Sequence, residues 1–451
     1  MGKYFGTDGI RGAAGQPPLD VASVTAFGRA LGEWLHVHHS QPVIVGQDTR
    51  ESGRWLAEAL ISGLQAAGIG SEYAGVVTTP AVAYLARMRP FSAGVMVSAS
   101  HNPYHDNGLK VFDHTGYKFP DAVENEIEAL MDAALAQPAP AVEPIAVREN
   151  PDYKQEYLEY LRNTAAAEPG QAGLPAGMRI VLDCAHGAAS ELAPELFRSL
   201  GCAIHLLHAA PNGRNINDEA GALHPERMAR AVVETGAGLG VAFDGDADRS
   251  IFADEKGALV DGDRILWIAG RDLLARRRLE PPLVIATVMS NLGLELALQA
   301  NGIRLERTAV GDRYVLERMQ ATGARLGGEQ SGHIIFGADS TTGDGLLTAV
   351  QLLAILARSG QTFSALQSGY RAFPQKLINV RVRERRALHE MDRVQRQIAA
   401  AEREFDGRGR VIVRYSGTEP LARVMVEAES EARVAHHAGE IAQAIRDEAG
   451  L

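Results

Sequence analysis

Residues 225–250 read PERMARAVVETGAGLGVAFDGDADRS and contain three kinds of segment in a row. The spacing of the apolar residues in 225–236 predicts an amphipathic helix. The short apolar run that follows predicts a buried strand, and a loop with three aspartates comes directly after it. Helices and strands that alternate in this way are typical of parallel or mixed sheets with helices on both faces.

The same alternation fills most of the 451-residue chain. It occurs in three sections, whereas the tail from about Lys376 predicts a smaller α+β unit with an antiparallel hairpin. We therefore expect an α/β protein with three similar α/β domains, each with a mixed sheet, and a smaller α+β C-terminal domain. The expected domains are residues 1–150, 151–252, 253–370 and 371–451.

The composition argues against several classes of protein. Hydrophobic residues make up 46% and charged residues 22%, as in a soluble globular enzyme. The net charge of −11 argues against a nucleic-acid-binding surface, so an anionic substrate would need a few well-placed cations. The N-terminus has no signal-like apolar region, and the longest apolar run, from Leu346, is too short to span a bilayer. Together with only two cysteines, Cys184 and Cys202, these features predict a cytoplasmic protein that binds neither nucleic acid nor membrane.

Asp244, Asp246 and Asp248 alternate along the loop after the predicted strand. Three carboxylates in this arrangement can converge on one hard cation. Without a cation, carboxylates about 5 Å apart in a cleft would repel by roughly 3 kcal/mol per pair. An EF-hand does not fit, because Arg249 occupies the sixth position, where that loop needs glycine. Arg249 favours instead a phosphate held by metal and arginine together, with a solvated acidic turn as the alternative.

Ser100 ends the apolar run GVMVSAS, residues 94–100. It lacks the Gly-x-Ser-x-Gly elbow of serine hydrolases, and in an extended chain the adjacent His101 would point away from it. A serine without an activating base can still carry a phosphoryl group if a metal and a lysine surround it. The aspartate loop would supply the metal and Lys110 the cation. The alternative is that Ser100 only caps a turn before Asn102.

Two further motifs offer groups that could bind a substrate. RYSGTEP, residues 414–420, combines an arginine that suits phosphate with hydroxyls and a glycine backbone that can form an anion nest. The stretch GGEQSGHIIF places Glu329, Ser331 and His333 at alternate positions, so they would share one side of an extended segment. A carboxylate and a hydroxyl can then bind vicinal sugar hydroxyls. A plain turn and a hairpin with a capping glutamate are the respective alternatives.

Taken together, these motifs describe a serine that carries phosphate, a metal, a group of sugar contacts and a second phosphate nest. A sugar with a phosphate at either end would fit this combination. The residues alone leave open whether the enzyme moves that phosphate or hydrolyses it.

The motifs SASHNP, DGDADR, GEQSGH and RYSGTEP occur in the order in which the α-D-phosphohexomutase superfamily carries them. The chain resembles this superfamily over essentially its whole length. The resemblance implies four domains that form a heart shape around a central cleft. His186 and the segment GALHPE from Gly221 depart from the family pattern, which affects only accessory contacts.

The resemblance also implies a role for each site residue. Ser100 would carry the phosphoryl group, and Mg²⁺ would be bound by a phosphoserine oxygen and the three aspartates, Asp244, Asp246 and Asp248. The residues around the transferred proton and phosphate would be Lys110, His101, Arg11 and His333. The sugar hydroxyls would contact Glu329 and Ser331. The distal phosphate would contact Arg414, Ser416, Gly417, Thr418 and Arg423.

The opening FGTDGIRG, residues 5–12, and Gln330 resemble the branch of the superfamily that acts on glucosamine phosphates. This implies interconversion of glucosamine 6-phosphate and glucosamine 1-phosphate through a 1,6-bisphosphate, on the route to UDP-N-acetylglucosamine and cell-wall precursors. One Mg²⁺ per chain and a primer, glucosamine 1,6-bisphosphate or glucose 1,6-bisphosphate, would be the cofactors. The expected partner is a small phosphosugar substrate. A homodimer is compatible with the resemblance.

Three alternatives remain at this point. The nearest is a phosphomannomutase/phosphoglucomutase, whose members tend to have methionine at the position of Gln330. A metal-assisted sugar phosphatase would use the same serine but release phosphate. A non-catalytic module that binds calcium or a sugar phosphate would lose no turnover when Ser100 is replaced.

Overall fold

The computed structural model of the chain describes residues 2–6, 8–136, 145–165, 177–416 and 420–450. Its contacts divide the chain into two compact units. The main unit comprises Met1–Met289 and Leu305–Ser368, and the C-terminal unit comprises Ser290–Arg304 and Gly369–Leu451. The described strands form four sheets, with six, five, four and three strands in chain order. This confirms the expected fold class of three α/β domains and a smaller α+β domain.

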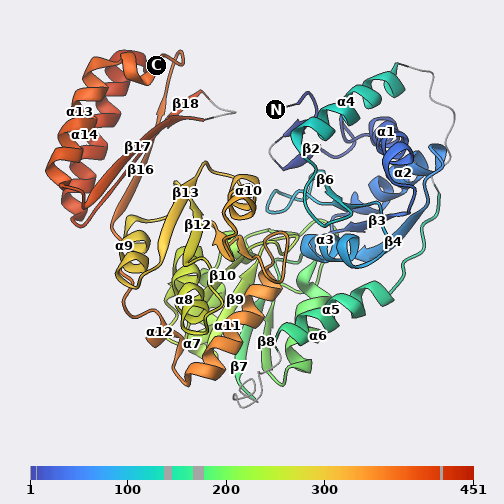
Figure 1. Cartoon of the computed structure of the whole chain (residues 1–451), viewed down its shortest axis with the longest axis horizontal. Helices are drawn as coiled ribbons and strands as arrows, with labels where there is room; N and C mark the ends of the chain where they lie inside the picture. Colours follow the sequence, from blue (N-terminus) through green and yellow to red (C-terminus); the bar gives the residue numbers. More distant parts are fainter. Residues whose placement is uncertain (1, 7, 137–144, 166–176, 417–419, 451) are drawn as a thin grey trace. The chain divides into compact units, whose positions relative to one another are not determined.

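The first sheet has the strand order β1-β2-β6-β5-β3-β4 and mixes parallel with antiparallel pairs. Helices α1, α2 and α4 pack on one face and α3 on the other (Figure 1). Glycines allow α3 to approach, because a Cβ at Gly46 or Gly94 would lie 2.6 or 2.9 Å from Val82. The elements are β1 (Phe5–Gly6), β2 (Gly9–Ala13), α1 (Val21–His38), β3 (Val43–Gln47), α2 (Gly53–Ala66), β4 (Ser71–Val76), α3 (Thr79–Met88), β5 (Ala93–Val97), β6 (Asp106–Asp113) and α4 (Asp121–Leu135).

The second sheet, in the order β11-β10-β9-β7-β8, contains the stretch that predicted the fold. The helix α7 ends at Gly236, whose φ of 62° is the left-handed conformation that glycine adopts without strain, and β9 follows. The hairpin after the aspartate loop returns to this same sheet, so the sheet continues past the expected boundary at residue 252. The elements are α5 (Asp152–Thr164), β7 (Arg179–Asp183), α6 (Ala189–Ser199), β8 (Ala203–Leu207), η1 (Gly221–Leu223), α7 (Glu226–Thr235), β9 (Leu239–Phe243), β10 (Ser250–Asp254) and β11 (Leu259–Val260).

The third sheet has the order β13-β12-β14-β15, in which β12 and β14 are parallel and β14 and β15 form a hairpin. The apolar run from Leu346 forms α11, which is buried along most of its length, as the sequence predicted. The elements are α8 (Gly262–Ala275), β12 (Leu283–Thr287), β13 (Arg304–Thr308), α10 (Asp312–Thr322), β14 (Leu326–Gly328), β15 (Ile334–Phe336), α11 (Gly345–Ser359) and α12 (Phe363–Leu366).

The C-terminal unit has its own hydrophobic core under an antiparallel sheet in the order β16-β18-β17. Helices α13 and α14 cover one face of this sheet (Figure 1). The short helix α9 belongs to the same unit, and the backbone N–H of Leu292 donates to the Glu427 carboxylate at 3.0 Å. The elements are α9 (Leu292–Ala300), β16 (Gln375–Arg381), η2 (Leu388–Glu390), α13 (Asp392–Phe405), β17 (Gly409–Tyr415), β18 (Leu421–Ala428) and α14 (Glu431–Ala449).

Polar loops follow the carboxyl ends of two parallel strands in the main unit. Ser98 to Ser100 follow β5, and the aspartate loop follows β9. Ligands of open α/β sheets gather beyond such strand ends, which directs attention to these two loops. Among the described residues, no helix combines the length and the apolar character that a membrane span requires.

Candidate active site

Ser100 lies in a tight loop and is almost completely buried, with 1% of its surface exposed. Its φ of 53° is left-handed, a conformation that is uncommon for residues other than glycine and is concentrated at functional sites. The Ser100 hydroxyl donates to Oδ2 of Asp244 at 2.6 Å, and His101 Nδ1 lies 3.4 Å from the same hydroxyl. The chain is therefore not extended here, so the argument that His101 must point away from Ser100 was wrong.

Two side chains that the sequence did not single out hold this loop in place. The buried Arg50 donates to the backbone oxygens of Ser100, at 3.0 Å, and Asn102, at 2.8 Å, while Asp48 accepts from Arg50 Nε at 2.9 Å. Asn217 donates to the same two backbone oxygens at 2.8 and 3.0 Å. A buried arginine without a partner would be costly, and Asp48 neutralises Arg50. Arg50 can therefore stay buried and hold the backbone of the Ser100 loop through its hydrogen bonds.

The three aspartates converge as the spacing predicted. One ligand atom from each of Asp244, Asp246 and Asp248 lies within 4.8 Å of the others, and all three residues are buried. Burial, followed by the charges of Asp248 and Asp246, raises the pKa of Asp244 well above its usual range. Asp246 Oδ1 is buried and has no hydrogen-bond partner among the described residues. Asp248 Oδ1 is likewise without a hydrogen-bond partner among the described residues. Three carboxylates, two of them with an unsatisfied oxygen, fit a divalent cation such as Mg²⁺.

Lys110 reaches the aspartate cluster from β6. Its ammonium donates to Asp246 at 2.8 Å and to Asp248 at 2.9 Å, and 1% of the side chain is exposed. Burial would lower the pKa of Lys110, but Asp246 and Asp248 hold it well above its usual value. The lysine is therefore charged and lies in the same cluster as the serine, as predicted.

Lys110 is also part of a closed ring of alternating charges, which we call the charge ring. Lys110 lies 3.3 Å from Asp8, and Lys118 donates to Asp8 and to Asp312 at 2.5 Å each. The ring closes through His333, which lies 3.7 Å from Asp312 and 3.8 Å from Asp248. In order, its members are Asp248, Lys110, Asp8, Lys118, Asp312 and His333.

The charge ring shifts the pKa values of its members in consistent directions. Although burial alone would raise the pKa of Asp8, Lys110 and Lys118 hold it well below its usual range. Burial alone would lower the pKa of His333, but Asp248 and Asp312 raise it. The ring therefore stabilises the charged forms of groups that are buried or partly buried. Asp8, Lys118 and Asp312 were not predicted from the sequence.

A cavity of about 400 Å³ opens beside the charge ring. Arg11, which donates to Asp8, and the half-buried Arg249 both line it. Burial, with Arg249 and Arg11 nearby, lowers the pKa of His101 to about 4, so this histidine is neutral at physiological pH. The cavity is lined by Tyr4, Gly6, Asp8, Gly9, Arg11, His101, Asp248, Arg249, Val310, Gly311, Asp312, Glu329 and His333. Arginines beside the aspartate cluster are the cations that an anionic substrate needs.

The segment with Glu329, Ser331 and His333 is a hairpin turn between β14 and β15, and not an extended strand. The Gly332 N–H donates to the backbone oxygen of Glu329 at 3.0 Å, which closes the turn. Glu329 and His333 are buried, whereas Ser331 is exposed and its hydroxyl donates to the Glu329 carboxylate at 3.3 Å. The hairpin that the sequence left open as the alternative is the conformation that forms. In it, a hydrogen bond joins the Ser331 hydroxyl to the Glu329 carboxylate.

The predicted phosphate loop lies in the C-terminal unit. Arg414 and Arg423 face each other directly across β17 and β18. Burial and the charge of Arg423 lower the pKa of Arg414. Like charges in opposite cross-strand positions are destabilising unless an anion neutralises them. Ser416 is buried and its N–H donates to Leu421, while Gly417 and Thr418 lie outside the described residues.

Comparison with known protein families gives four matches in chain order. The matching models are phosphoglucomutase/phosphomannomutase alpha/beta/alpha domain I at residues 2–137, domain II at 155–257, domain III at 261–373 and the C-terminal domain at 377–444. Together they cover most of the chain. The end of the second match lies close to the end of the second sheet at Val260.

Curated relatives match over the full length. The chain is 50% identical over 451 residues to "Phosphoglucosamine mutase" of Solibacter usitatus, with 99% of each chain covered. It is 49% identical over 457 residues to the protein of the same name from Koribacter versatilis, covering 100% of this chain and 98% of that one. A "Phosphoglucosamine mutase" of Geobacillus kaustophilus is 46% identical over 458 residues, with 100% of both covered.

Solved structures show the same fold. A phosphoglucomutase/phosphomannomutase family protein from Burkholderia thailandensis has a TM-score of 0.79 at 26% identity, covering 98% of this chain and 97% of that one. An Aspergillus fumigatus N-acetylphosphoglucosamine mutase, solved with GlcNAc-6P and magnesium, has a TM-score of 0.66 at 20% identity, with 98% and 95% covered. From the four domain matches and the full-length relatives, the chain belongs to the phosphoglucosamine mutase family within the α-D-phosphohexomutase superfamily.

Proposed function

We propose that this protein interconverts glucosamine 6-phosphate and glucosamine 1-phosphate, with Ser100 as the group that carries the phosphoryl. The single observation that carries the proposal is the position of the Ser100 hydroxyl, 2.6 Å from Asp244 in the buried aspartate cluster. The names of the full-length relatives supply the substrate class. A 1,6-bisphosphate of glucosamine or glucose would prime the serine.

Asp244, Asp246 and Asp248, together with an oxygen of phosphorylated Ser100, would hold one Mg²⁺. The magnesium in the Aspergillus relative agrees with the hard oxygen donors present here. When bound, the cation supplies positive charge that offsets the charge developing on the transferred phosphoryl group.

In the first transfer, the hydroxyl oxygen at C1 of glucosamine 6-phosphate attacks the phosphorus of phospho-Ser100. A P–O1 bond forms as the Oγ–P bond breaks, and the proton of the sugar hydroxyl ends on Oγ of Ser100. The free hydroxyl can then donate to Asp244, as it does in this structure. Lys110, held charged by two aspartates, and Arg249 stabilise the negative charge of the transition state.

In the second transfer, the 1,6-bisphosphate lies in the opposite orientation and Ser100 takes the phosphoryl group from O6. Its Oγ–P bond forms, the P–O6 bond breaks, and the serine proton ends on O6, so no phosphate is lost. Glu329 and Ser331 would bind the sugar hydroxyls in both orientations. Arg414, Ser416, Gly417, Thr418 and Arg423 would bind the phosphate that is not transferred.

Intact-mass spectrometry tests the role of Ser100. After incubation with glucose 1,6-bisphosphate, the wild-type chain should gain the mass of one phosphate, and Ser100→Ala should gain none and lose turnover. Ser331→Ala is the control, because it changes a sugar contact and should still be phosphorylated. Phosphorylation of Ser100→Ala at the wild-type level would overturn the proposal.

A coupled assay with glucosamine, glucose and mannose phosphates tests the substrate. A preference for glucosamine phosphate supports the proposal, whereas a preference for mannose phosphate would make the protein a phosphomannomutase/phosphoglucomutase. Release of inorganic phosphate at the rate of substrate loss would make it a phosphatase instead.

A cytoplasmic location is also part of this proposal. Cys184 and Cys202 are both buried free thiols, which agrees with a reducing compartment. A homodimer remains a prediction, which light scattering of the purified protein would check.

A further inference from the structure

Thr79, the first residue of α3, lies against the aspartate loop. Its hydroxyl donates to Oδ2 of Asp246 at 2.5 Å, and its backbone N–H donates to the backbone oxygen of Asp246 at 3.0 Å. Both residues are buried, with 1% and 0% of their surfaces exposed. They are 167 positions apart and belong to different α/β domains. One threonine therefore holds both the backbone and the carboxylate of a predicted metal ligand.

The two oxygens of the Asp246 carboxylate have different surroundings. Oδ2 accepts from the Thr79 hydroxyl at 2.5 Å and from the Lys110 ammonium at 2.8 Å. Oδ1 is buried and accepts no hydrogen bond from the described residues. A buried carboxylate oxygen without a donor is costly unless another group, such as a cation, binds it. Thr79 and Lys110 thus occupy one oxygen and leave the other to a cation.

The hydroxyl of Thr79 restricts the carboxylate in a way that Lys110 alone does not. Lysine has a flexible stem and three rotatable donors, and the Lys110 ammonium also donates to Asp248 at 2.9 Å. Threonine is β-branched and has few χ1 rotamers, so the helix that carries it sets the direction of its hydroxyl. Lys110 therefore supplies charge to the aspartate cluster, whereas Thr79 supplies direction.

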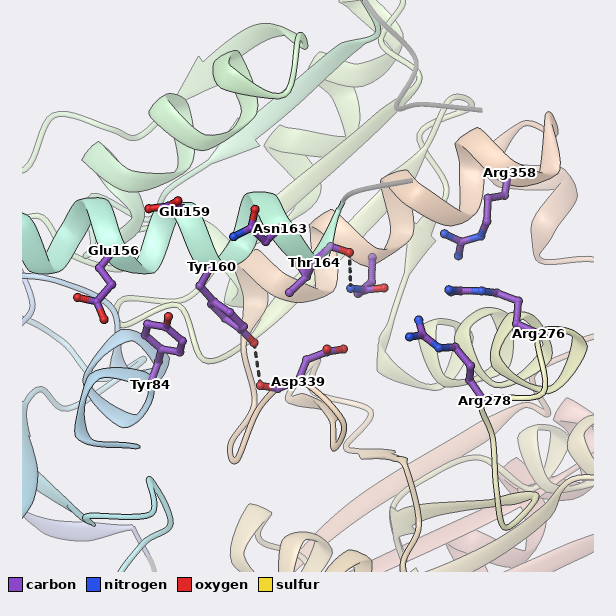
Figure 2. Close-up of a pocket in the computed structure, with 11 residues that line it drawn as sticks. Tyr84, Glu156, Glu159, Tyr160, Asn163, Thr164, Arg276, Arg278, Asp339 and Arg358 are labelled. Carbon is purple, nitrogen blue, oxygen red and sulfur yellow. Dashed lines mark hydrogen bonds between the residues drawn. The ribbon is translucent and has the colours of Figure 1, made fainter. Parts of the chain in front are cut away.

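The helix that carries Thr79 is held at its start and along its length. The side chain of Thr78 caps its N-terminus. Further along the helix, Tyr84 stacks on Tyr160 of α5, with ring centroids 4.3 Å apart, on the wall of a cavity of about 470 Å³ (Figure 2). The Tyr160 hydroxyl in turn donates to the backbone oxygen of Asp339 at 2.8 Å (Figure 2). These contacts keep the first residue of α3 in a fixed place beside the aspartate loop.

We propose that Thr79 is a positioning residue for the metal site, which fixes the Asp246 carboxylate so that Oδ1 faces the cation. The inference rests on the proposed function in one respect, that Asp244, Asp246 and Asp248 bind Mg²⁺. It does not depend on which sugar phosphate is the substrate. Replacing a residue that orients a metal ligand typically weakens metal binding or activity by about 10- to 100-fold.

Titration of the unphosphorylated full-length protein with Mn²⁺ tests this role. Mn²⁺ suits the same oxygen ligands as Mg²⁺, and electron paramagnetic resonance measures the free ion. Thr79→Val keeps the shape of the side chain but removes the hydroxyl, so it should weaken Mn²⁺ binding by about tenfold. Thr79→Ser keeps the hydroxyl and should bind Mn²⁺ nearly as tightly as the wild type.

Thr115→Val is the matched control. The Thr115 hydroxyl also donates to an aspartate, Asp113, at 2.5 Å, but Thr115 is exposed and lies outside the aspartate cluster. Its replacement should leave the affinity for Mn²⁺ unchanged. An equal loss of affinity in Thr79→Val and Thr115→Val would overturn the proposed role of Thr79.

The dependence of turnover on Mg²⁺ gives a second readout that a purely structural role would not change. Thr79→Val should need about tenfold more Mg²⁺ for half-maximal turnover, with an unchanged KM for the sugar phosphate. A loss of turnover that is the same at every Mg²⁺ concentration, with Mn²⁺ bound as in the wild type, would mean that Thr79 only stabilises the fold and would overturn the inference.

The outcomes separate this inference from the proposed function. Equal Mn²⁺ affinities of Thr79→Val and the wild type would overturn the inference and leave the proposed function intact. A wild type that binds no Mn²⁺ would overturn the metal site and the inference with it. Normal Mn²⁺ binding without phosphorylation of Ser100 would overturn the proposed function and leave the role of Thr79 intact.

Discussion

Single side chains in the catalytic cavity depend on partners that lie far from them in the sequence. Lys118 is bonded to Asp8 and Asp312, which are separated from it by 110 and 194 positions. Arg50 and Asn217 reach the Ser100 loop from two different domains. Arg50 and Asn217 bond to the backbone of the predicted Ser100, whereas Lys118 bonds to two carboxylates of the charge ring. Replacing any of the three should therefore affect the site through position or charge.

Replacing Lys118 tests how strongly the charge ring stabilises the fold. Lys118→Met should lower the free energy of unfolding by about 3 kcal/mol, because it leaves two mostly buried carboxylates without their shared cation. Urea unfolding followed by circular dichroism measures this. Lys3→Met is the control, since the Lys3–Asp132 pair lies on the surface and should contribute little. Equal effects of the two variants would contradict a stabilising ring.

Replacing Asn217 tests whether it positions the serine loop. Asn217→Gly removes the amide that donates to Ser100 and Asn102 but suits the positive φ of 61° at this position. We expect kcat to fall about tenfold with little change in KM, because misplacement of the phosphorylated serine affects the transfer step and not substrate binding. Asn212→Gly, in an exposed part of the same loop, should leave both constants unchanged. A change in KM alone would argue against this role.

The motifs predicted which polar residues lie together, because the signals that place them are local. Asp244, Asp246 and Asp248 lie close together in the sequence, and Ser100 and Lys110 flank one loop. Asp8, Lys118 and Asp312 carry no such local signal, because isolated charged residues look like surface residues until the fold brings them together. A polar, charged run directly after an apolar strand, as in VIVGQDTR, is the one signal that could have indicated Arg50.

At the scale of elements, the apolar runs predicted the strands and the buried helix α11. The polar loops at strand ends predicted that the Ser100 loop and the aspartate loop meet. The turn between β14 and β15 was harder to predict, because alternation of polar residues is compatible with a strand as well as a turn. The N-terminus of α11 was not predicted as a special feature. Asp344 caps it, accepting from the Leu347 N–H at 2.9 Å and from the Tyr157 hydroxyl at 2.8 Å.

This cap makes the stability of the protein depend on pH. Burial raises the pKa of Asp344 from 3.8 to about 6. Between these two values the folded chain binds the proton more tightly than the unfolded chain does, so the stability contributed by Asp344 falls as the pH rises through this window and stays low above it. Asp344→Asn should therefore be more stable than the wild type at pH 8, by up to about 3 kcal/mol, with little difference near pH 4.

Urea unfolding at several pH values measures this difference. Asp20→Asn is the control, because Asp20 caps α1 in the same way but is partly exposed. A constant difference between Asp344→Asn and the wild type at all pH values would contradict the prediction.

At the scale of the whole molecule, the two compact units have separate hydrophobic cores. The core of the C-terminal unit is formed by its own sheet, α13 and α14. The chain has three tryptophans, and all of them, Trp34, Trp55 and Trp267, lie in the main unit. Tryptophan fluorescence therefore reports on the main unit alone, whereas circular dichroism reports on both.

This distribution allows the independence of the two units to be measured. Ile441→Ala, at a fully buried position of α14, should destabilise the C-terminal unit by about 3 kcal/mol and shift part of the dichroism transition to lower temperature. The fluorescence transition should stay at the wild-type temperature. Parallel shifts of both signals would mean that the units unfold together.

The charge ring takes its members from all three α/β domains of the main unit: Asp8, Lys110 and Lys118 from the first, Asp248 from the second, and Asp312 and His333 from the third. Such a circuit cannot close until every one of these domains has reached its native arrangement. We therefore expect phosphoryl transfer to require all three domains, so that a fragment lacking one of them, or a chain in which they have not yet come together, cannot spend phosphate on side reactions.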